Sequence, residues 1–179
     1  MALAGIHLLL FTGARLSEII ELEWSHIDFD AGTVALPARK GDGRRPHPVS
    51  NDAMTILVDI ERIEGSHYVL PRLSDPEKHL SKAVMETSWQ RVRRHAKIED
   101  VRLHDLRHTF GTLASQAGGN AFSISHILRH SNVTITNRYV NPDANPIRAA
   151  SNTVSERISA GLRGEGNRSR PLHYSETQQ

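Results

Sequence analysis

Side chains able to act on a phosphate group are concentrated in the second half of the chain. His104 lies three positions before Arg107, a spacing that puts both on one face of a helix and lets them reach one ligand. Arg129 and His130 are adjacent, and Tyr139 follows nine residues after His130. A guanidinium binds the nonbridging oxygens of a phosphate, an imidazole gives or takes a proton, and a phenol can attack phosphorus. These residue types favour phosphate chemistry, although an isolated pair or tyrosine of this kind more often lies on a surface or in a core.

Zinc binding is the competing interpretation of the histidines. His104 and His108 are spaced i,i+4, and so are His126 and His130. A metalloprotease helix needs a glutamate directly after the first histidine, and here an aspartate and an isoleucine stand in those positions. The sequence also has no P-loop, no G-x-G-x-x-G and no G-x-S-x-G. We therefore expect neither a metal nor another cofactor.

Composition limits the class of protein. The chain has 179 residues, 38% of them apolar, which is enough for one compact domain with its own core. No run approaches the roughly 18 apolar residues of a membrane span, and no positive charge precedes the first apolar residues, so no secretory signal is expected. The absence of cysteine excludes disulfides and thiolate zinc sites and suits a reducing cytoplasm.

The basic residues form two clusters, although the net charge is only +2. Lysine supplies four of the 22 cations, and arginine is favoured where a planar fork must hold phosphate or carboxylate. The first cluster consists of Arg39, Lys40, Arg44 and Arg45. The second consists of Arg91, Arg93, Arg94 and Lys97. Such clusters favour an anionic partner, and solvated helix faces with a charged turn are the alternative.

Apolar periodicity predicts a mainly helical domain. Helices are expected at residues 3–11, from Arg15 onward, and at 51–62, 82–97, 104–116, 123–129, 133–138 and 143–161. Ser50 and Ser81 are the expected caps of the helices that follow them. Of the helix over 82–97, we expect four side chains to face inward, namely Val84, Met85, Trp89 and Val92.

A small antiparallel sheet is expected in the first third of the chain. Residues 27–29 and 33–36 read as strands around a glycine-containing turn. Pro46 and Pro48 restrict the next strand to an edge, because proline has no N–H to donate to a neighbour. Residues 162–179 lack apolar periodicity, which predicts a disordered C-terminal tail.

Four segments in this order together resemble the catalytic domain of the tyrosine recombinases, the phage integrase family, over roughly residues 3–160. They are Thr12-Gly13-Ala14-Arg15-Leu16-Ser17-Glu18-Ile19, continued by residues 22–28; Arg39-Lys40 with Pro48-Val49-Ser50; His104-Asp105-Leu106-Arg107-His108-Thr109-Phe110; and Leu128-Arg129-His130-Ser131 with Arg138-Tyr139. Each motif alone is weak, and their combination is specific.

The resemblance implies a mainly α fold with a small antiparallel β-sheet (α+β), with the catalytic domain over residues 1–161. It implies that Arg15, Arg107 and His130 hold the phosphate, that Lys40 is the general acid for the leaving 5′ oxygen, and that His104 assists. Tyr139 would be the nucleophile that becomes linked to a 3′ phosphate. The remaining candidates for contact with DNA are Arg39, Arg44, Arg45 and Arg129.

Two departures from the family pattern stand out. Arg129 occupies a position where the family usually has glycine, where it adds a phosphate contact or disturbs His130. The family's separate N-terminal DNA-binding domain and a first catalytic-domain helix are expected to be missing before residue 3.

By resemblance, the function expected is site-specific recombination or integration on double-stranded DNA, without metal. The expected assembly is a tetramer on synapsed DNA, with the state of the isolated domain left open, in the cytoplasm of a bacterium or a phage-infected cell. The alternatives are a DNA-binding remnant that no longer recombines and a relaxase resembling the type IB topoisomerases.

Overall fold

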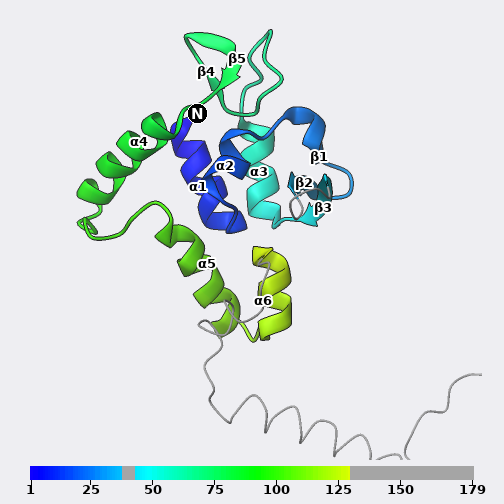
Figure 1. The fold of residues 1–179 in the computed structure, drawn as a ribbon, viewed down its shortest axis with the longest axis vertical. Coiled ribbons are helices and arrows are strands. Elements are labelled where there is room, and N and C mark those ends of the chain that lie inside the picture. Colours follow the sequence, from blue (N-terminus) through cyan, green and yellow to red (C-terminus); the bar gives the residue numbers. More distant parts are fainter. Residues whose placement is uncertain (38–42, 130–179) are drawn as a thin grey trace, which may run out of the picture. The chain divides into compact units, whose positions relative to one another are not determined.

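The computed structural model describes residues 1–37 and 43–129 (Figure 1). The chain divides into two units, Met1–Asn141 and Pro142–Gln179, and every described residue belongs to the first. The described helices are α1 (Ala2–Thr12), α2 (Leu16–Ile20), the short 3-10 helix η1 (Trp24–His26), α3 (Asn51–Asp59), α4 (Lys82–His95), α5 (Asp105–Gln116) and α6 (Ala121–Leu128). The strands are β1 (Ile27–Asp28), β2 (Thr33–Pro37), β3 (Arg44–Pro48), β4 (Pro71–Arg72) and β5 (Asp75–His79). The predicted fold class, mainly α with small antiparallel sheets, is confirmed.

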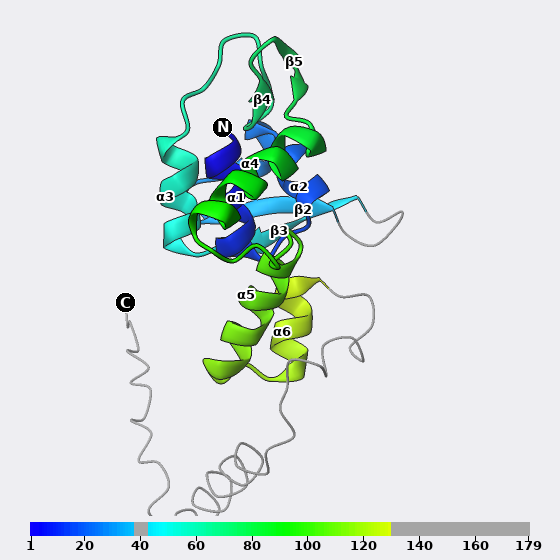
Figure 2. The same cartoon turned by 90° about the vertical axis from the view of Figure 1, so that its left-hand side faces the viewer.

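Helix α1 lies at the centre of the domain and packs against α2, α3, α4 and α5 (Figures 1 and 2). Its buried side chains include Ile6, Leu8 and Leu9, which join the main apolar core. A side chain at Gly5 would place its Cβ 2.9 Å from both Leu70 Cδ1 and Met85 Cε. Only a residue without a side chain therefore lets the flanking segments pack this closely on α1.

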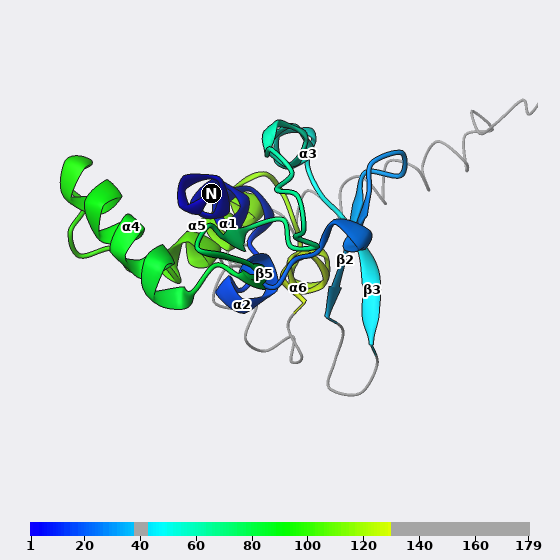
Figure 3. The same cartoon turned by 90° about the horizontal axis from the view of Figure 1, so that it is seen from above.

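The three-stranded sheet has the order β1-β2-β3 and is antiparallel throughout. Val34 on β2 pairs with Ile27 on β1 and with His47 on β3. Seen from above, this sheet and α4 lie on opposite sides of α1 (Figure 3). Strand β3 is an edge strand, as its two prolines predict.

Side-chain caps fix where three helices begin. The hydroxyl of Ser50 accepts a hydrogen bond from Ala53 N at 3.3 Å, and that of Ser81 accepts one from Val84 N at 3.3 Å. Both caps were predicted from the sequence. A third cap, Asn120, accepts from Ser123 N at 2.8 Å and starts α6 two residues before the predicted helix.

Some predictions for these helices are wrong in detail. Helix α3 ends at Asp59 rather than at residue 62, because Ile60 turns to an extended backbone and is buried in the core. On α4, Met85 and Trp89 are buried as expected, whereas Val84 is 44% exposed. One residue corresponds to about 100° of rotation, so a position next to Met85 lies outside the buried face.

The hairpin of β4 and β5 and the helix η1 were not predicted. Residues 71–79 are rich in proline and charge and show no alternation of apolar residues, so nothing in the pattern indicates a strand. The helices expected at 133–138 and 143–161 and the tail at 162–179 lie outside the described residues.

His47, on β3, is one of the few buried polar residues, with only 6% of its surface exposed. Burial lowers its pKa to about 4, with further lowering by the positive charge of Arg129 and by His126 and Arg107, while Glu18 raises it. The imidazole is therefore neutral at neutral pH.

Stability should fall as the pH falls through the range that separates the two pKa values of His47. The unfolded chain takes up a proton near pH 6.5, whereas the folded chain resists protonation down to about pH 4. This difference corresponds to a loss of about 3 kcal/mol over that window. Urea unfolding at pH 7.5 and at pH 5 should show a clear loss in the wild type and a smaller one in His47→Val. The exposed His7, changed to Gln, is the control, and an equal loss in all three proteins would contradict the assignment.

Candidate phosphate-binding site

The sharp turn between α1 and α2 positions the first candidate residue, Arg15. Gly13 ends α1 in the left-handed conformation, with a φ of 60°. The Thr12 hydroxyl donates to Leu8 O at 2.6 Å and accepts from Ala14 N at 3.2 Å, which closes the turn. Arg15 then has an extended backbone and is the residue from which α2 begins.

Helices α5 and α6 pack directly on this turn. A Cβ at Gly13 would lie 2.6 Å from Phe110 Cδ1 on α5 and 2.9 Å from Leu128 Cδ2 on α6. Glycine at this position therefore serves both the left-handed backbone and the close approach of two other helices.

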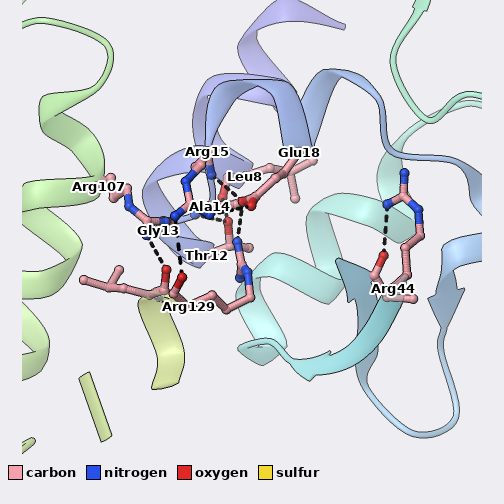
Figure 4. A network of polar contacts seen from close by, with 11 residues as sticks. Leu8, Thr12, Gly13, Ala14, Arg15, Glu18, Arg44, Arg107 and Arg129 are labelled. Carbon is pink, nitrogen blue, oxygen red and sulfur yellow. Dashed lines mark hydrogen bonds and ion pairs between the residues drawn. The ribbon is translucent and has the colours of Figure 1, made fainter. Parts of the chain in front are cut away.

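Arg107, on α5, joins the ends of α1 and α6. Its Nη1 donates to Gly13 O and its Nη2 donates to Leu128 O (Figure 4). Both acceptors are carbonyls at helix C-termini, which have no partner within their own helix and carry the negative end of the helix dipole. Arg107 is only 4% exposed, and these two bonds offset the cost of burying its charge.

Arg15 and Glu18 form a tight local unit. The backbone N of Arg15 donates to Glu18 Oε2 at 2.7 Å, and Arg15 Nη1 donates to Glu18 Oε1 at 2.9 Å. Arg15 Nη2 also donates to the carbonyl of Arg129 at 3.5 Å. The Arg15 side chain is 46% exposed, so its guanidinium is bound to Glu18 and to the Arg129 carbonyl and is still accessible to solvent.

Arg129 shares the same carboxylate. Its Nη2 donates to Glu18 Oε2, and its side chain is 15% exposed (Figure 4). Burial by itself would raise the pKa of Glu18, but Arg129 and then Arg15 lower it, so the net shift is downward and the group is a carboxylate. Glu18 was not among the residues predicted for the site. The available signal was a carboxylate in the first turn of a helix, three residues after Arg15.

His104 stands at the start of α5 and lines a pocket together with Arg107. The other lining residues come from α1, the turn that follows it, α2, α4 and the segment before α5: Leu9, Ala14, Leu16, Glu86 and Leu103. Burial, then His108 and Arg107, lower the pKa of His104, which favours a neutral imidazole at neutral pH. The structure thus brings His104 and Arg107 to one pocket, as their spacing predicts.

The other candidates divide into two groups. Arg44 and Arg45 lie exposed on β3, and Arg44 Nη1 donates to Ala35 O at 3.2 Å, away from the arginine cluster (Figure 4). The candidates that lie outside the described residues are Arg39, Lys40, His130 and Tyr139. The described strands on either side of residues 38–42 are paired, with Pro37 opposite Arg44.

The described residues contain no group of three or more His, Asp or Glu side chains that could hold a metal ion. Within the same part of the chain, no helix combines the length and apolar character needed to cross a membrane. The arginines of the site form a cluster in which Arg15 and Arg129 share the carboxylate of Glu18, while Arg107 binds the carbonyls of Gly13 and Leu128 at the adjoining helix ends. Its exposed member, Arg15, is available to bind an anion.

Comparison with known proteins adds independent evidence. The model of the phage integrase family matches residues 2–145. Tyrosine recombinase XerC of Xylella fastidiosa (strain 9a5c) is 29% identical over 78% of this chain and 48% of its own length. A shufflon-specific DNA recombinase of Escherichia coli is 28% identical over 74% of this chain and 33% of its own.

Solved structures show the same fold. The XerA recombinase matches with a TM-score of 0.63 at 21% identity, over 85% of this chain and 60% of its own. The XerH site-specific recombinase bound to its difH substrate matches with a TM-score of 0.67 at 19% identity, over 84% and 46%. The chain spans about half the length of the curated relatives it matches. With a family model that covers most of its residues, the chain belongs to the phage integrase family, the family of the tyrosine recombinases.

Proposed function

We propose that this chain is the catalytic domain of a site-specific recombinase, which cleaves and rejoins DNA strands through a 3′-phosphotyrosine intermediate. The observation that carries the proposal is the convergence of Arg15 and Arg107, which are far apart in the sequence, on adjoining backbone carbonyls at the C-termini of α1 and α6. Fixed guanidinium groups in such a cluster suit an oxyanion whose charge grows during reaction.

The proposed step breaks one bond and forms one. The phenol oxygen of Tyr139 attacks phosphorus and loses its proton, while the bond from phosphorus to the 5′ oxygen breaks and that oxygen gains a proton. Arg15, Arg107 and His130 hold the nonbridging oxygens. Lys40 donates the proton to the 5′ oxygen, and His104, neutral and beside Arg107, assists proton transfer or positioning.

The phosphodiester energy is kept in the bond to tyrosine. A second DNA hydroxyl can therefore attack the phosphotyrosine and reseal the strand without ATP. Because guanidinium groups neutralise the phosphate oxygens, the proposed step does not call for a metal ion. A solved structure of the same fold, the Tn1549 transposon integrase, is in complex with transposon right end DNA, which supports double-stranded DNA as the partner of this chain.

The wider setting is part of the same proposal. The catalytic domain extends over residues 1–161, and residues 162–179 form a tail. As in the family it belongs to, copies of the protein would assemble as a tetramer on synapsed DNA, in the cytoplasm of a bacterium or a phage-infected cell. Arg39, Arg44 and Arg45 would contact the DNA backbone away from the reacting phosphate.

Replacing the nucleophile should abolish covalent capture of DNA. A nicked suicide substrate that carries the protein's own recombination site should trap a protein–DNA adduct in the presence of EDTA. Tyr139→Phe, which lacks only the attacking oxygen, should trap none on a denaturing gel. Tyr68→Phe is the matched control, because the ring of Tyr68 packs against those of His67 and His79, which are not among the candidate site residues.

Several outcomes would contradict this reading. An adduct in Tyr139→Phe would mean that another group attacks, and an adduct that requires a divalent metal would rule out the mechanism. Salt-dependent duplex binding without any adduct would favour a protein that only binds DNA. Relaxation of supercoiled plasmid without preference for a site would favour a topoisomerase-like activity.

Arg15 and Arg107 should respond differently to replacement by lysine. A lysine at 107 cannot donate to both carbonyls at once, so Arg107→Lys should lower the free energy of unfolding by about 2–4 kcal/mol. Arg15→Lys removes contacts of a half-exposed side chain and should cost less than about 1 kcal/mol. Both variants should form adduct at least about 100-fold more slowly. Urea unfolding and single-turnover trapping test this, and equal losses of stability would contradict it.

A further inference from the structure

The backbone of Arg129 adopts a conformation that suits glycine better than arginine. Its φ and ψ are 52° and 45°, in the left-handed region, where a Cβ is strained against the following carbonyl. Its N–H donates to His126 O at 3.1 Å, and these are the roles of a residue that ends a helix. A glycine would fulfil them without strain, so the arginine side chain must contribute something that the helix end does not require.

That side chain is directed into the protein. One of its terminal nitrogens binds Glu18, while Nε and Nη1 are buried and have no hydrogen-bond partner among the described residues. Burial lowers the pKa of Arg129, and Glu18 acts in the opposite direction. The positive charge of Arg129 therefore lies in a largely buried position, where the carboxylate of Glu18 is its one hydrogen-bond partner among the described side chains. Arg129 thus has less access to a DNA phosphate than Arg15, whose side chain is 46% exposed against 15%.

Glu18 links the two arginines. Its Oε2 accepts from Arg129, its Oε1 accepts from Arg15, and it is only 5% exposed. A buried carboxylate with one half-exposed partner would be poorly compensated. The second, more buried guanidinium is the largest of the influences that keep it ionised, and together with the backbone N of Arg15 it holds Oε2, which sets the direction in which Oε1 is presented to Arg15.

We propose that Arg129 is a positioning residue that fixes the guanidinium of Arg15, through Glu18, in the orientation that binds the DNA phosphate. The inference rests on the proposed function, since it assigns a positioning role to a residue of the same site. The carbonyl of Arg129 contributes as well, because it accepts the other terminal nitrogen of Arg15 at 3.5 Å. Both terminal nitrogens of Arg15 are therefore held, Nη1 by the carboxylate that Arg129 binds and Nη2 by the carbonyl of Arg129 itself.

His47 is consistent with this arrangement. Arg129 is the largest of the charges that lower the pKa of this buried histidine, to about 4, so the two groups interact across β3 and the end of α6. A neutral imidazole adds no further positive charge beside Arg129. The buried charges at this junction are then the carboxylate of Glu18 and the guanidinium groups of Arg129 and Arg107.

Three substitutions separate the side chain from the backbone. Arg129→Met removes the charge and keeps the bulk, Arg129→Lys keeps the charge, and Arg129→Gly relieves the strained backbone. We expect Arg129→Met and Arg129→Gly to slow adduct formation by about 10- to 100-fold, the size of effect expected when a reacting group is misplaced. Arg129→Lys should lose less than about fivefold. Lys78→Met, which breaks the exposed ion pair with Asp75, is the control and should match the wild type.

Arg129→Gly is the decisive variant for a purely structural role. If Arg129 only ended α6, glycine would equal or exceed the wild type in both stability and rate, and that result would overturn the proposal. Urea unfolding of each variant shows that it is folded under the conditions of the rate measurement.

A double-mutant cycle with Glu18→Gln tests the route through the carboxylate. If Arg129 acts through Glu18, adding Arg129→Met to Glu18→Gln should change the rate by less than about twofold, because the link is already broken. A further 10- to 100-fold loss would mean that Arg129 acts on the phosphate directly, and it would overturn the proposal.

A readout without DNA distinguishes failure of this inference from failure of the proposed function. In nitrogen-labelled protein, NMR measures rotation of the Arg15 guanidinium about its Nε–Cζ bond. We expect rotation at least about tenfold faster in Arg129→Met and Arg129→Gly than in the wild type and Lys78→Met. Unchanged rotation overturns the inference even if the enzyme is active. Faster rotation supports it even if the wild type forms no adduct, in which case the proposed function fails alone.

Discussion

The burial of the Arg107 charge is the constraint on which the arrangement around the site depends. A guanidinium that is 4% exposed needs acceptors, and it finds them at the C-termini of α1 and α6. The two helix ends and α5 must therefore meet at one point, which explains why Gly13 lies against both Phe110 and Leu128. The same interaction that holds the helices together also fixes one of the two arginines of the site.

The balance of charge at this point suits the proposed reaction. Three guanidinium groups lie at the ends of α1 and α6, those of Arg15, Arg107 and Arg129, and the carboxylate of Glu18 is paired with the first and the last, which leaves an excess of two positive charges. A phosphodiester carries one negative charge, and attack by an oxyanion adds a second in the transition state. A cluster fixed before the substrate arrives stabilises the second charge more than the first, which is the property that accelerates a reaction.

Local features were predictable, and contacts between distant segments were not. Ser50 and Ser81 were identified as caps because capping depends on residues three apart, and the pairing of His104 with Arg107 depends on one turn of helix. The hairpin of β4 and β5 was missed because its residues follow no apolar pattern. The position of Arg129 beside Glu18, more than a hundred residues away in the sequence, depends on how α2 and α6 pack.

Arg129 illustrates why a departure from a family pattern can be interpreted only once the surroundings of the residue in the fold are known. From the sequence, an arginine before His130 could either contact phosphate or disturb the histidine. The structure shows that its backbone is left-handed, that its guanidinium donates to Glu18, and that its carbonyl accepts a hydrogen bond from Arg15. A strained residue that is also a buried, incompletely paired cation is unfavourable on two counts. Such a residue is expected where its unfavourable conformation and burial are offset by a function, such as orienting another side chain. Here that side chain is Arg15, which Arg129 contacts directly through its carbonyl and indirectly through Glu18.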